Sequence, residues 1–442
     1  MSPIFWELPP ITLPKVSPMA RAVHDGQYKR VVMVCSSQSG KTESLIDLIG
    51  ARLDQRPAPI LYVGPIRDFL TDQFEPRLMS LLDEAEALSA KVVRGKRDHT
   101  PEAIAAFRQG WGLDDPLWQQ YARSQSLRAN RPLCSPGVKL HGAGFIVSAE
   151  QAAALGLGSV AGLEQRVRPY RSGKDLMARS RQAFVIDLQG LDEPQVQQRF
   201  PSLHAWICEH VRGPRQAGSP SGTRDAAEYA RNFWLLGKPR KGLRRALAGL
   251  PRYIATAETS RHRVFVFMPP EILADNTLVC IASADAAVLA TLSSRLHQTW
   301  ALATGGRLGV GNHPRYNKTR CFDPFPFPAC APEPQARLRE LGELLDGHRK
   351  QRQLAHPDLT LTCMYNVLEK RRRGQPLSAA EQVIDEKGGL ATLQELHAAV
   401  DAAVFAAYGW PSDLHAEPLL CRLLHLHAER AQEEQRPPTK PP

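Results

Sequence analysis

Three residues near the N-terminus have the types and the order of a phosphate-binding loop. Gly40, Lys41 and Thr42 follow an apolar run at 31–35 and precede a stretch with helical spacing at 43–53. In such a loop, backbone N–H groups surround the phosphates, the lysine neutralises the terminal phosphates, and the threonine hydroxyl reaches Mg²⁺. We therefore expect these residues to bind a nucleotide, with ATP and Mg²⁺ as the candidate cofactors and Thr42 as a weak candidate metal ligand.

The loop is incomplete as the site of an ATPase. Cys35 stands where the pattern G-x-x-x-x-G-K-[ST] has its first glycine. Hydrolysis also needs a carboxylate at the end of a neighbouring strand, to hold Mg²⁺ and position water. Residues 60–117 contain no apolar strand that ends in Asp-Glu. Asp187 ends an apolar run, but it lies far downstream, and we expect it to cap a turn rather than to hold Mg²⁺.

A second set of candidate residues is basic. Residues 100–330 contain 29 lysines and arginines, of which 24 are arginines, against 17 acidic residues, whereas the flanking segments are nearly neutral. The planar arginine fork suits bidentate contacts with phosphate oxygens and guanine edges. Double-stranded DNA is therefore the expected partner. A solvated basic face on an arginine-rich protein is the open alternative.

Three segments contain the candidate DNA contacts. A turn at 166–176 joins arginines, a tyrosine and a lysine, and His262 lies between two arginines at the start of an expected strand. The glycine-rich segment 305–320 combines close backbone approach with arginine, which can read guanine, and asparagine, which can read adenine. An exposed basic turn and a simple strand connection are the alternatives, and for His262 a polar core or phosphate-facing position is favoured over a catalytic one. The candidate DNA-binding residues are Arg168, Arg171, Lys174, Arg261, Arg263, Arg307, Asn312, Arg315, Tyr316, Asn317 and Lys318.

The sequence predicts no catalytic residue. An amino-methyltransferase needs a glycine-rich SAM loop after its first strand and a [DNS]-P-P-[FYW] loop that hydrogen-bonds the target amino group of a flipped base. The glycine-rich segment 156–162 lacks a preceding buried strand, and Asp323 is followed by Pro-Phe-Pro without an adjacent proline pair. Asp385, Glu386 and Lys387 lie in a helical, solvated stretch rather than in a nuclease motif.

Hydrophobic spacing predicts the elements that position these residues. The first 99 residues have the β-α-β-α order that begins a parallel sheet. Residues 118–330 alternate apolar runs with turn residues, which is typical of a mixed α/β body, and a helical region follows the proline-rich stretch 322–334. The expected strands lie at 144–148, 183–188, 252–256, 262–268 and 278–283, and the expected helices at 193–211, 286–303, 335–349, 362–372, 379–386, 390–408 and 418–430.

Composition narrows the class of protein. At 442 residues the chain has room for roughly two to four domains, and 43% hydrophobic with 23% charged residues is ordinary for a globular protein. The eight cysteines have no C-x-x-C or zinc-ligand spacing, which favours reduced thiols. We find no membrane-length apolar run and no signal-like start, so we expect a cytoplasmic protein that does not bind membranes.

The N-terminal part resembles the ATPase domain of the GpA family of phage terminase large subunits, the motors that package DNA. The similarity lies in SSQSGKTE (36–43), LIGARLDQRPAPILYVGP (48–65), FEPRLMSLL (74–82) and RGKRD (94–98). The resemblance implies that Lys41 and Thr42 contact phosphate and Mg²⁺. The family's Walker B strand and nuclease domain have no counterpart in these residues.

From about residue 118 the chain resembles the end of MmeI-like class I SAM-dependent DNA methyltransferases, which are adenine-specific modification or restriction-modification enzymes. In that family this region holds a target recognition domain and a helical domain, which bind duplex DNA and select the sequence to be methylated. The similarity lies in ANRPLCSPGVKLHGAGFIVS (129–148), RVRPYRSGKDL (166–176), FVIDLQGL (184–191), LPRYIATAETSRHRVF (250–265), LSSRLHQTWALATGGRLGVGNHPRYNKTRCFDPFPFP (292–328), HPDLTLTCMYNVLEKRRRGQPL (356–377) and LHAAVDAAVFAAYGWP (396–411).

The two resemblances together predict the organisation of the chain. An α/β fold would combine a partial P-loop parallel sheet, a mixed α/β target recognition domain and a small helical C-terminal domain. The expected function is the DNA recognition part of an adenine methyltransferase, with SAM chemistry supplied by a separate methyltransferase catalytic subunit. An ATP-binding terminase fragment, or a rearranged gene product without activity, are the alternatives. The expected boundaries are 1–99 (terminase-like), 100–117 (junction), 118–330 (target recognition), 331–430 (helical) and 431–442 (disordered tail).

Overall fold

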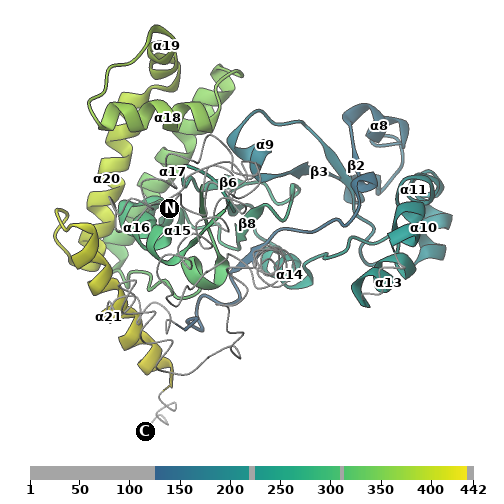
Figure 1. Cartoon of the computed structure of the whole chain (residues 1–442), viewed down its shortest axis with the longest axis horizontal. Helices are drawn as coiled ribbons and strands as arrows, with labels where there is room; N and C mark the ends of the chain where they lie inside the picture. Colours follow the sequence, from purple (N-terminus) through teal and green to yellow (C-terminus); the bar gives the residue numbers. More distant parts are fainter. Residues whose placement is uncertain (1–124, 219–223, 309–312, 436–442) are drawn as a thin grey trace, which may run out of the picture. The chain divides into compact units, whose positions relative to one another are not determined.

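The computed structural model describes residues 125–218, 224–308 and 313–435. The chain divides into two compact units, and every described residue belongs to the unit formed by Gln120–Leu308 and His313–Pro442 (Figure 1). The partial P-loop sheet expected at 1–99 lies outside the described residues and stays a prediction. In the part that is described, two four-stranded sheets and a series of C-terminal helices form the mixed α/β fold that the sequence predicts.

The first sheet has the strand order β1-β8-β5-β6, and all its neighbouring strands are antiparallel. Its central strand, β5, is buried along its whole length, which explains the continuous apolar run at this position. The expected strands at 252–256, 262–268 and 278–283 are confirmed in this sheet. Its members are β1 (Cys134–Pro136), β5 (Tyr253–Ala257), β6 (Val266–Met268) and β8 (Leu278–Ile281).

The second sheet has the order β2-β4-β3-β7, in which only the β3–β7 pair is parallel. The chain runs from β6 in the first sheet to β7 in the second and returns to the first as β8. A short stretch of consecutive residues therefore supplies strands to both sheets. The strand expected at 183–188 is present as β4, whereas the one expected at 144–148 is reduced to two residues because a 3₁₀ turn occupies Ala143–Phe145. Its members are β2 (Ile146–Val147), β3 (Val167–Arg171), β4 (Phe184–Ile186) and β7 (Leu273–Ala274).

Helices α10 (Glu193–Arg199) and α11 (Pro201–Ile207) pack against the second sheet, followed by a π-helical turn, η5 (Cys208–Arg212). One helix was expected at 193–211, but Phe200 leaves the helical conformation and Pro201, which has no N–H to continue the helix, begins a new one. Shorter helices complete this part of the unit: α8 (Ala149–Ala154), α9 (Gly173–Met177), α12 (Gly213–Gly218), α13 (Arg224–Arg231), α14 (Lys241–Leu247) and the 3₁₀ turns η3 (Ala143–Phe145) and η4 (Leu163–Gln165).

The helix expected at 286–303 is also divided, into α15 (Ala286–Ser293) and α16 (Arg295–Thr304). Ser294 lies between them in an extended conformation, and its hydroxyl accepts the backbone N–H of His297. Serine is a preferred residue at this N-cap position because its oxygen satisfies a free N–H of the first turn. The cap changes the direction of the chain and brings His297 into the core of the first sheet.

Five helices form the C-terminal region, as the sequence predicts. Helix α17 packs along α15, where Gly342 approaches Ala286 so closely that a Cβ atom on the glycine would lie 2.1 Å from the alanine carbonyl oxygen. Contacts between α17 and α20 extend this packing (Figure 1). The helices are α17 (Pro332–Ala355), α18 (Leu361–Arg372), α19 (Ala379–Gly388), α20 (Leu390–Tyr408) and α21 (Ala416–Gln435).

One boundary in this region differs from expectation. Helix α21 continues to Gln435, into the stretch 431–442 that the sequence predicts to be a disordered tail. The carboxylate of Glu434 accepts the backbone N–H of Arg128 at 2.8 Å, so a tertiary contact holds the last turn of the helix. Composition gives no sign of such a contact. The other domain boundaries stay predictions.

Candidate nucleic-acid interface

Arg168, on the central strand β3 of the second sheet, is held by backbone carbonyl groups. Its Nε donates to the carbonyl oxygen of Glu271 at 3.1 Å, and its Nη2 to that of Pro270 at 2.8 Å. Its Nη1 lies 3.7 Å from a carboxylate oxygen of Asp187. Burial lowers the pKa of this guanidinium from its usual value. Two of its five N–H groups therefore donate within the protein, and a third nitrogen lies near a carboxylate.

Asp187, directly after β4, is the partner of a second arginine. The side chain of Asp187 accepts hydrogen bonds from Arg244 Nη1 at 2.6 Å and Nη2 at 3.1 Å, and the residue is only 3% exposed. It also accepts the backbone N–H of Gln189 at 3.4 Å. These contacts agree with the prediction that Asp187 caps a turn, and they account for its carboxylate without a metal ion.

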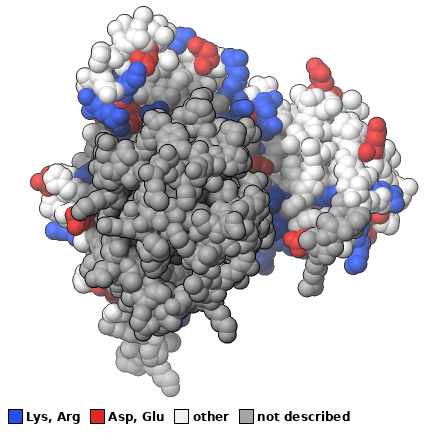
Figure 2. All heavy atoms as spheres, in the orientation of Figure 1, with Lys and Arg blue, Asp and Glu red and all other residues white. Residues whose placement is uncertain are grey.

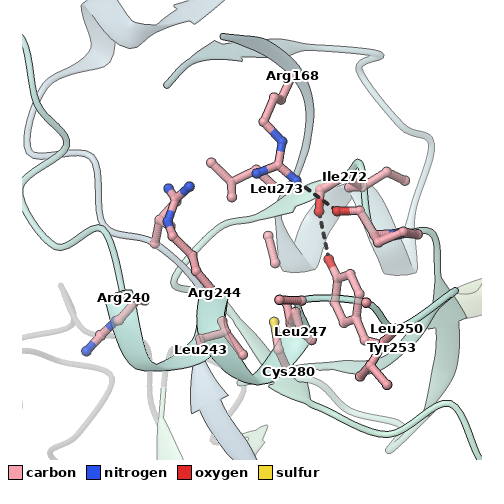
Figure 3. A pocket seen from close by; sticks show the side chains of 15 residues that line it. Arg168, Arg240, Leu243, Arg244, Leu247, Leu250, Tyr253, Ile272, Leu273 and Cys280 are labelled. Carbon is pink, nitrogen blue, oxygen red and sulfur yellow. Dashed lines mark hydrogen bonds between the residues drawn. The ribbon is translucent and has the colours of Figure 1, made fainter. Parts of the chain in front are cut away.

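Three arginines lie at a pocket of about 360 Å³ beside α14 (Figure 3). Leucine side chains form much of its wall, and the hydroxyl of Tyr253 donates to the carbonyl oxygen of Ile272 at 3.0 Å. Arg168 and Arg244 share Asp187. Arg240 extends away from Tyr253 in Figure 3, and its Nε donates to the carbonyl oxygen of Gly137 at 3.1 Å. The pocket therefore combines an apolar interior with a basic edge.

Arg171 and Lys174 mark the passage from β3 into α9. Ser172 caps this helix by accepting the N–H of Asp175 at 3.2 Å. Burial raises the pKa of Asp175, but hydrogen bonds from Arg181 and Ser172 outweigh it and hold that pKa below the usual value. Lys174 is exposed and Arg171 half-buried. Both lie at the edge of the sheet where the sequence predicts phosphate contacts.

Arg261 and His262 face the C-terminal helix α18. Arg261 Nη2 donates to Glu369 Oε2 at 3.0 Å, and His262 Nε2 lies 2.7 Å from Asn366 Oδ1. Burial lowers the pKa of His262. This placement agrees with a polar core position for His262, which is one of the two positions that the sequence favours over a catalytic role.

Arg263 and Tyr316 lie inside the fold. The Arg263 guanidinium donates to Thr256 Oγ1 at 3.1 Å, to the carbonyl oxygen of Pro314 at 3.1 Å and to that of Ala257, and it lies 5.1 Å from the centre of the Tyr316 ring. Burial lowers the pKa of Arg263 to about 10. Tyr316 is 1% exposed. In this conformation neither side chain is available to DNA, so both anchor the segment rather than read bases.

The glycine-rich segment forms a two-stranded hairpin, β9 (Gly306–Leu308) and β10 (His313–Arg315), in which Arg307 is paired with Pro314. Asn312 lies outside the described residues. Arg315 is 39% exposed, and its Nε and Nη2 donate to Glu258 Oε1 at 3.2 and 2.9 Å. Among the described residues, no hydrogen bond or ion pair joins these hairpin residues to Arg168, Arg171 or Lys174.

Asn317 and Lys318 begin the π-helical turn η7 (Lys318–Phe322). The backbone N–H of Asn317 donates to Cys321 Sγ at 3.3 Å. Lys318 Nζ lies 2.6 Å from Asp323 Oδ2, and the Asp323 side chain is 2% exposed. Burial raises the pKa of Asp323. Asp323 is thus the buried partner of a lysine.

The basic run at the end of α18 is neutralised by its neighbours. Lys370 Nζ lies 2.5 Å from Glu381 Oε1 and Arg371 Nη1 lies 2.8 Å from Asp385 Oδ2, while Arg373 pairs with Glu369. Over α18 and α19, Figure 2 shows basic and acidic side chains intermixed. This run therefore stabilises the packing of two helices. Asp385 takes part in the same contacts.

A basic surface that the sequence analysis did not select lies at 137–139 and 238–245. Lys139 and Lys238 exchange backbone hydrogen bonds of 3.1 and 2.9 Å across an antiparallel bridge. Helix α14 follows Lys238 directly. The available signal was the run KPRKGLRR at 238–245, which has five basic residues and no acidic one. The exposed or half-buried cations of this surface are Lys139, Lys238, Arg240, Lys241 and Arg245.

The predicted nucleotide site has no structural description, because Gly40, Lys41 and Thr42 lie outside the described residues. Within 125–218, 224–308 and 313–435, no cluster of three histidine, cysteine or acidic side chains could hold a metal ion. The same stretches include no helix that is long and apolar enough to span a membrane.

Comparison with known proteins identifies two regions of the chain. Residues 121–329 match the family model for the target recognition domain of MmeI, and residues 10–111 match that for the ATPase domain of the phage terminase large subunit gpA. A comparison with curated proteins gives no match.

A solved structure of the Type IIL restriction-modification enzyme MmeI, in complex with DNA, has a similar fold, with a TM-score of 0.53 and 17% sequence identity. The alignment covers 68% of this chain and 36% of the MmeI chain, so the protein spans little more than a third of that enzyme. The chain is thus similar to the ATPase domain of the gpA terminase large subunit over residues 10–111 and to the target recognition domain of MmeI over residues 121–329.

Proposed function

We propose that the chain selects the DNA sequence at which an adenine-specific methyltransferase of the restriction-modification type acts. The match of residues 121–329 to a target recognition domain is the observation that carries this proposal. This sequence has neither a SAM loop nor a [DNS]-P-P-[FYW] motif, so we propose that a separate polypeptide supplies the catalytic domain and its SAM. The chain's own task would be to bind duplex DNA and position it.

The placement of the basic side chains supports a division of tasks among them. Arg315 is half-exposed and, among the described residues, no other arginine forms an ion pair with its partner Glu258, so its guanidinium can exchange Glu258 for a guanine edge. Lys174 and Arg171 border the second sheet and suit phosphate contacts. Arg263 and Tyr316 would fix the backbone that carries Arg315.

Selection of randomised DNA duplexes by the purified chain, at physiological salt, tests the proposal. We expect one short sequence to be enriched, because base-edge contacts discriminate among sequences whereas phosphate contacts do not. The Arg315→Ala variant provides the matched control, and its selected sequences should lose the preference at one position. Retention of DNA without any enriched sequence would contradict a recognition function.

A methylation assay tests the requirement for a separate catalytic subunit. The chain with SAM and its selected duplex should transfer no methyl group, and addition of a methyltransferase subunit encoded nearby should direct methylation to adenine within the selected sequence. Methyl transfer by the chain alone would overturn the proposed division of labour.

Binding of ATP is a second candidate function, which the match of residues 10–111 to a terminase ATPase domain favours. Lys41 and Thr42 would hold the phosphates and Mg²⁺. Calorimetric titration with ATP and Mg²⁺ should give binding that Lys41→Ala abolishes. DNA-stimulated hydrolysis that depends on Lys41 would favour a packaging motor, and absence of nucleotide binding would rule out this second function.

A further inference from the structure

Lys139 and Lys238 are directly opposed in an antiparallel bridge. Each backbone N–H donates to the carbonyl oxygen of the other residue, at 3.1 and 2.9 Å. Directly opposed residues of antiparallel strands project their side chains to the same face of the sheet, about 5.5 Å apart at Cα. Both lysines are exposed. Two positive charges are therefore held side by side by the backbone.

Like charges in this relationship destabilise a strand pair. Among the described residues, neither lysine has an acidic partner. The basic run of α18 is different, since Lys370 and Arg371 each contact a carboxylate. The protein thus neutralises its cations at one place and leaves them concentrated at another.

Three further cations, Arg240, Lys241 and Arg245, belong to the same surface. We call this set of five residues, Lys139, Lys238, Arg240, Lys241 and Arg245, the lysine-bridge surface. The Nε of Arg240 donates to the carbonyl oxygen of Gly137 at 3.1 Å, which holds the start of α14 against the segment that contains Lys139. Lys241 and Arg245 are exposed on α14 and, within the part of the chain that the structure describes, form no ion pair. The surface is therefore built from two segments fixed to each other.

The pKa of the neighbouring His141 reflects the positive charge of this surface. Burial lowers the pKa of His141, and the positive charges of Lys139, Arg215 and Lys238 lower it further, although Asp225 acts in the opposite direction. The local field is thus positive, as a site for an anion requires.

We propose that the lysine-bridge surface binds the phosphate backbone of duplex DNA, as a contact that does not depend on base sequence. The proposal rests on the DNA recognition function proposed above. Helix α14 has seven residues, about 10 Å of axial length, so its cations and the lysine pair extend over about three phosphates of one strand. A single phosphate ion would not fill such a surface. The phosphates would offset the repulsion between Lys139 and Lys238.

Neutralisation of the two lysines tests the proposal. The Lys139→Gln/Lys238→Gln variant should bind duplex DNA severalfold more weakly, whatever the sequence, and the slope of log K against log salt should fall by about 1.8. The Lys387→Gln variant is the matched control, because it removes one exposed positive charge that is already paired with Asp358. It should leave both affinity and slope unchanged. Equal affinity and slope for the double variant would overturn the proposal.

Reversal of the charge of Lys238 provides a second test. If the lysine only stabilised the fold, stability and DNA affinity would not change in opposite directions. Lys238→Glu places an opposite charge beside Lys139, so the melting temperature should rise while DNA affinity falls. A lower melting temperature, or a DNA affinity equal to that of the unchanged protein, would overturn the proposal. Inorganic phosphate should displace DNA no better than chloride at equal ionic strength, and selective displacement would indicate a phosphate-ion site instead.

The outcomes also separate this proposal from the proposed function. If the unchanged protein binds no duplex DNA, the recognition function fails. If it binds and selects a sequence, but the lysine variants bind equally well, only the lysine-bridge assignment fails.

Discussion

The Nε2 atom of His297 lies 2.8 Å from the hydroxyl oxygen of Tyr316, and solvent reaches neither side chain. Burial, followed by the nearby charge of Arg263, lowers the pKa of His297 to about 3. The histidine is therefore neutral at physiological pH. This hydrogen bond joins α16 to the end of the β9–β10 hairpin, and so connects the core of the first sheet to the segment that carries Arg315.

The first prediction concerns pH. In the unfolded chain His297 has an ordinary pKa near 6.5, so below that pH the unfolded state binds a proton that the folded state does not. The free energy of unfolding should therefore fall as pH decreases from 6.5 toward 3. The loss attributable to His297 should reach about 2 kcal/mol at pH 5.

Urea denaturation between pH 7 and pH 5 measures this effect. The His297→Gln variant lacks the titrating group, so its free energy of unfolding should vary with pH less steeply, by about 1.4 kcal/mol per pH unit. A variant with the same pH dependence as the unchanged protein would show that His297 is not neutral in the fold.

Tyr316→Phe should lower the free energy of unfolding by about 1 to 3 kcal/mol at pH 7, since it leaves a buried ring nitrogen of His297 without its partner.

Two glycines of α17 should respond oppositely to alanine. A Cβ at Gly342 would lie 2.1 Å from the carbonyl oxygen of Ala286, which belongs to α15 and cannot move alone. Gly342→Ala should lower the free energy of unfolding by about 1 to 3 kcal/mol. Gly347 has open space around it, so Gly347→Ala should raise stability by about 1 kcal/mol through helix propensity. Thermal unfolding of both variants decides the matter, and equal shifts would contradict the close approach of α15 and α17.

Asp187 should matter for stability and not for nucleotide binding. Asp187→Asn removes the charge shared by Arg168 and Arg244, whose side chains are 21% and 23% exposed. Because solvent partly screens these arginines, we expect a loss of about 2 to 3 kcal/mol, below that for a fully buried pair. ATP binding, where it is measurable, should stay unchanged. Loss of Mg²⁺-dependent ATP binding with normal stability would instead identify Asp187 as a metal ligand.

Arg315 and Lys318 should differ although they are three positions apart. Arg315→Ala should reduce discrimination at one base pair by about 1 to 3 kcal/mol, because a bidentate base contact is lost. Lys318→Met should instead lower stability, because it leaves the buried carboxylate of Asp323 unpaired. Competition binding with singly substituted duplexes, together with denaturation, separates the two effects. A uniform loss of affinity in Arg315→Ala would indicate a phosphate contact.

Many elements of the described part could be predicted from the sequence, because apolar periodicity records which faces are buried. The continuous run at Tyr253–Ala257 predicts the central strand β5, and the regular spacing after Pro332 predicts the C-terminal helices. The division of two helices, at Pro201 and at Ser294, was missed. In both cases the apolar spacing continues across the break, although the residue types at the break are those that begin a new helix.

The candidate site was predicted less completely. The basic composition of residues 100–330 indicates a polyanionic partner. Composition does not show which arginines already form hydrogen bonds or ion pairs within the protein. Arg263 donates to carbonyl oxygens within the fold, including that of Pro314, whereas the next residue, Arg315, remains half-exposed. Lys139 and Lys238 lie almost a hundred positions apart, and nothing local to either one predicts that they face each other.

The sequence by itself determined the class of fold of the described part and the two family resemblances, and it predicts a polyanionic partner, because these depend on local periodicity, residue type and motif. Only the tertiary structure decided which cations are neutralised and which remain available. Charge pairing depends on distances between residues that are remote in sequence, as with Arg168, Asp187 and Arg244, and the folded backbone alone sets those distances.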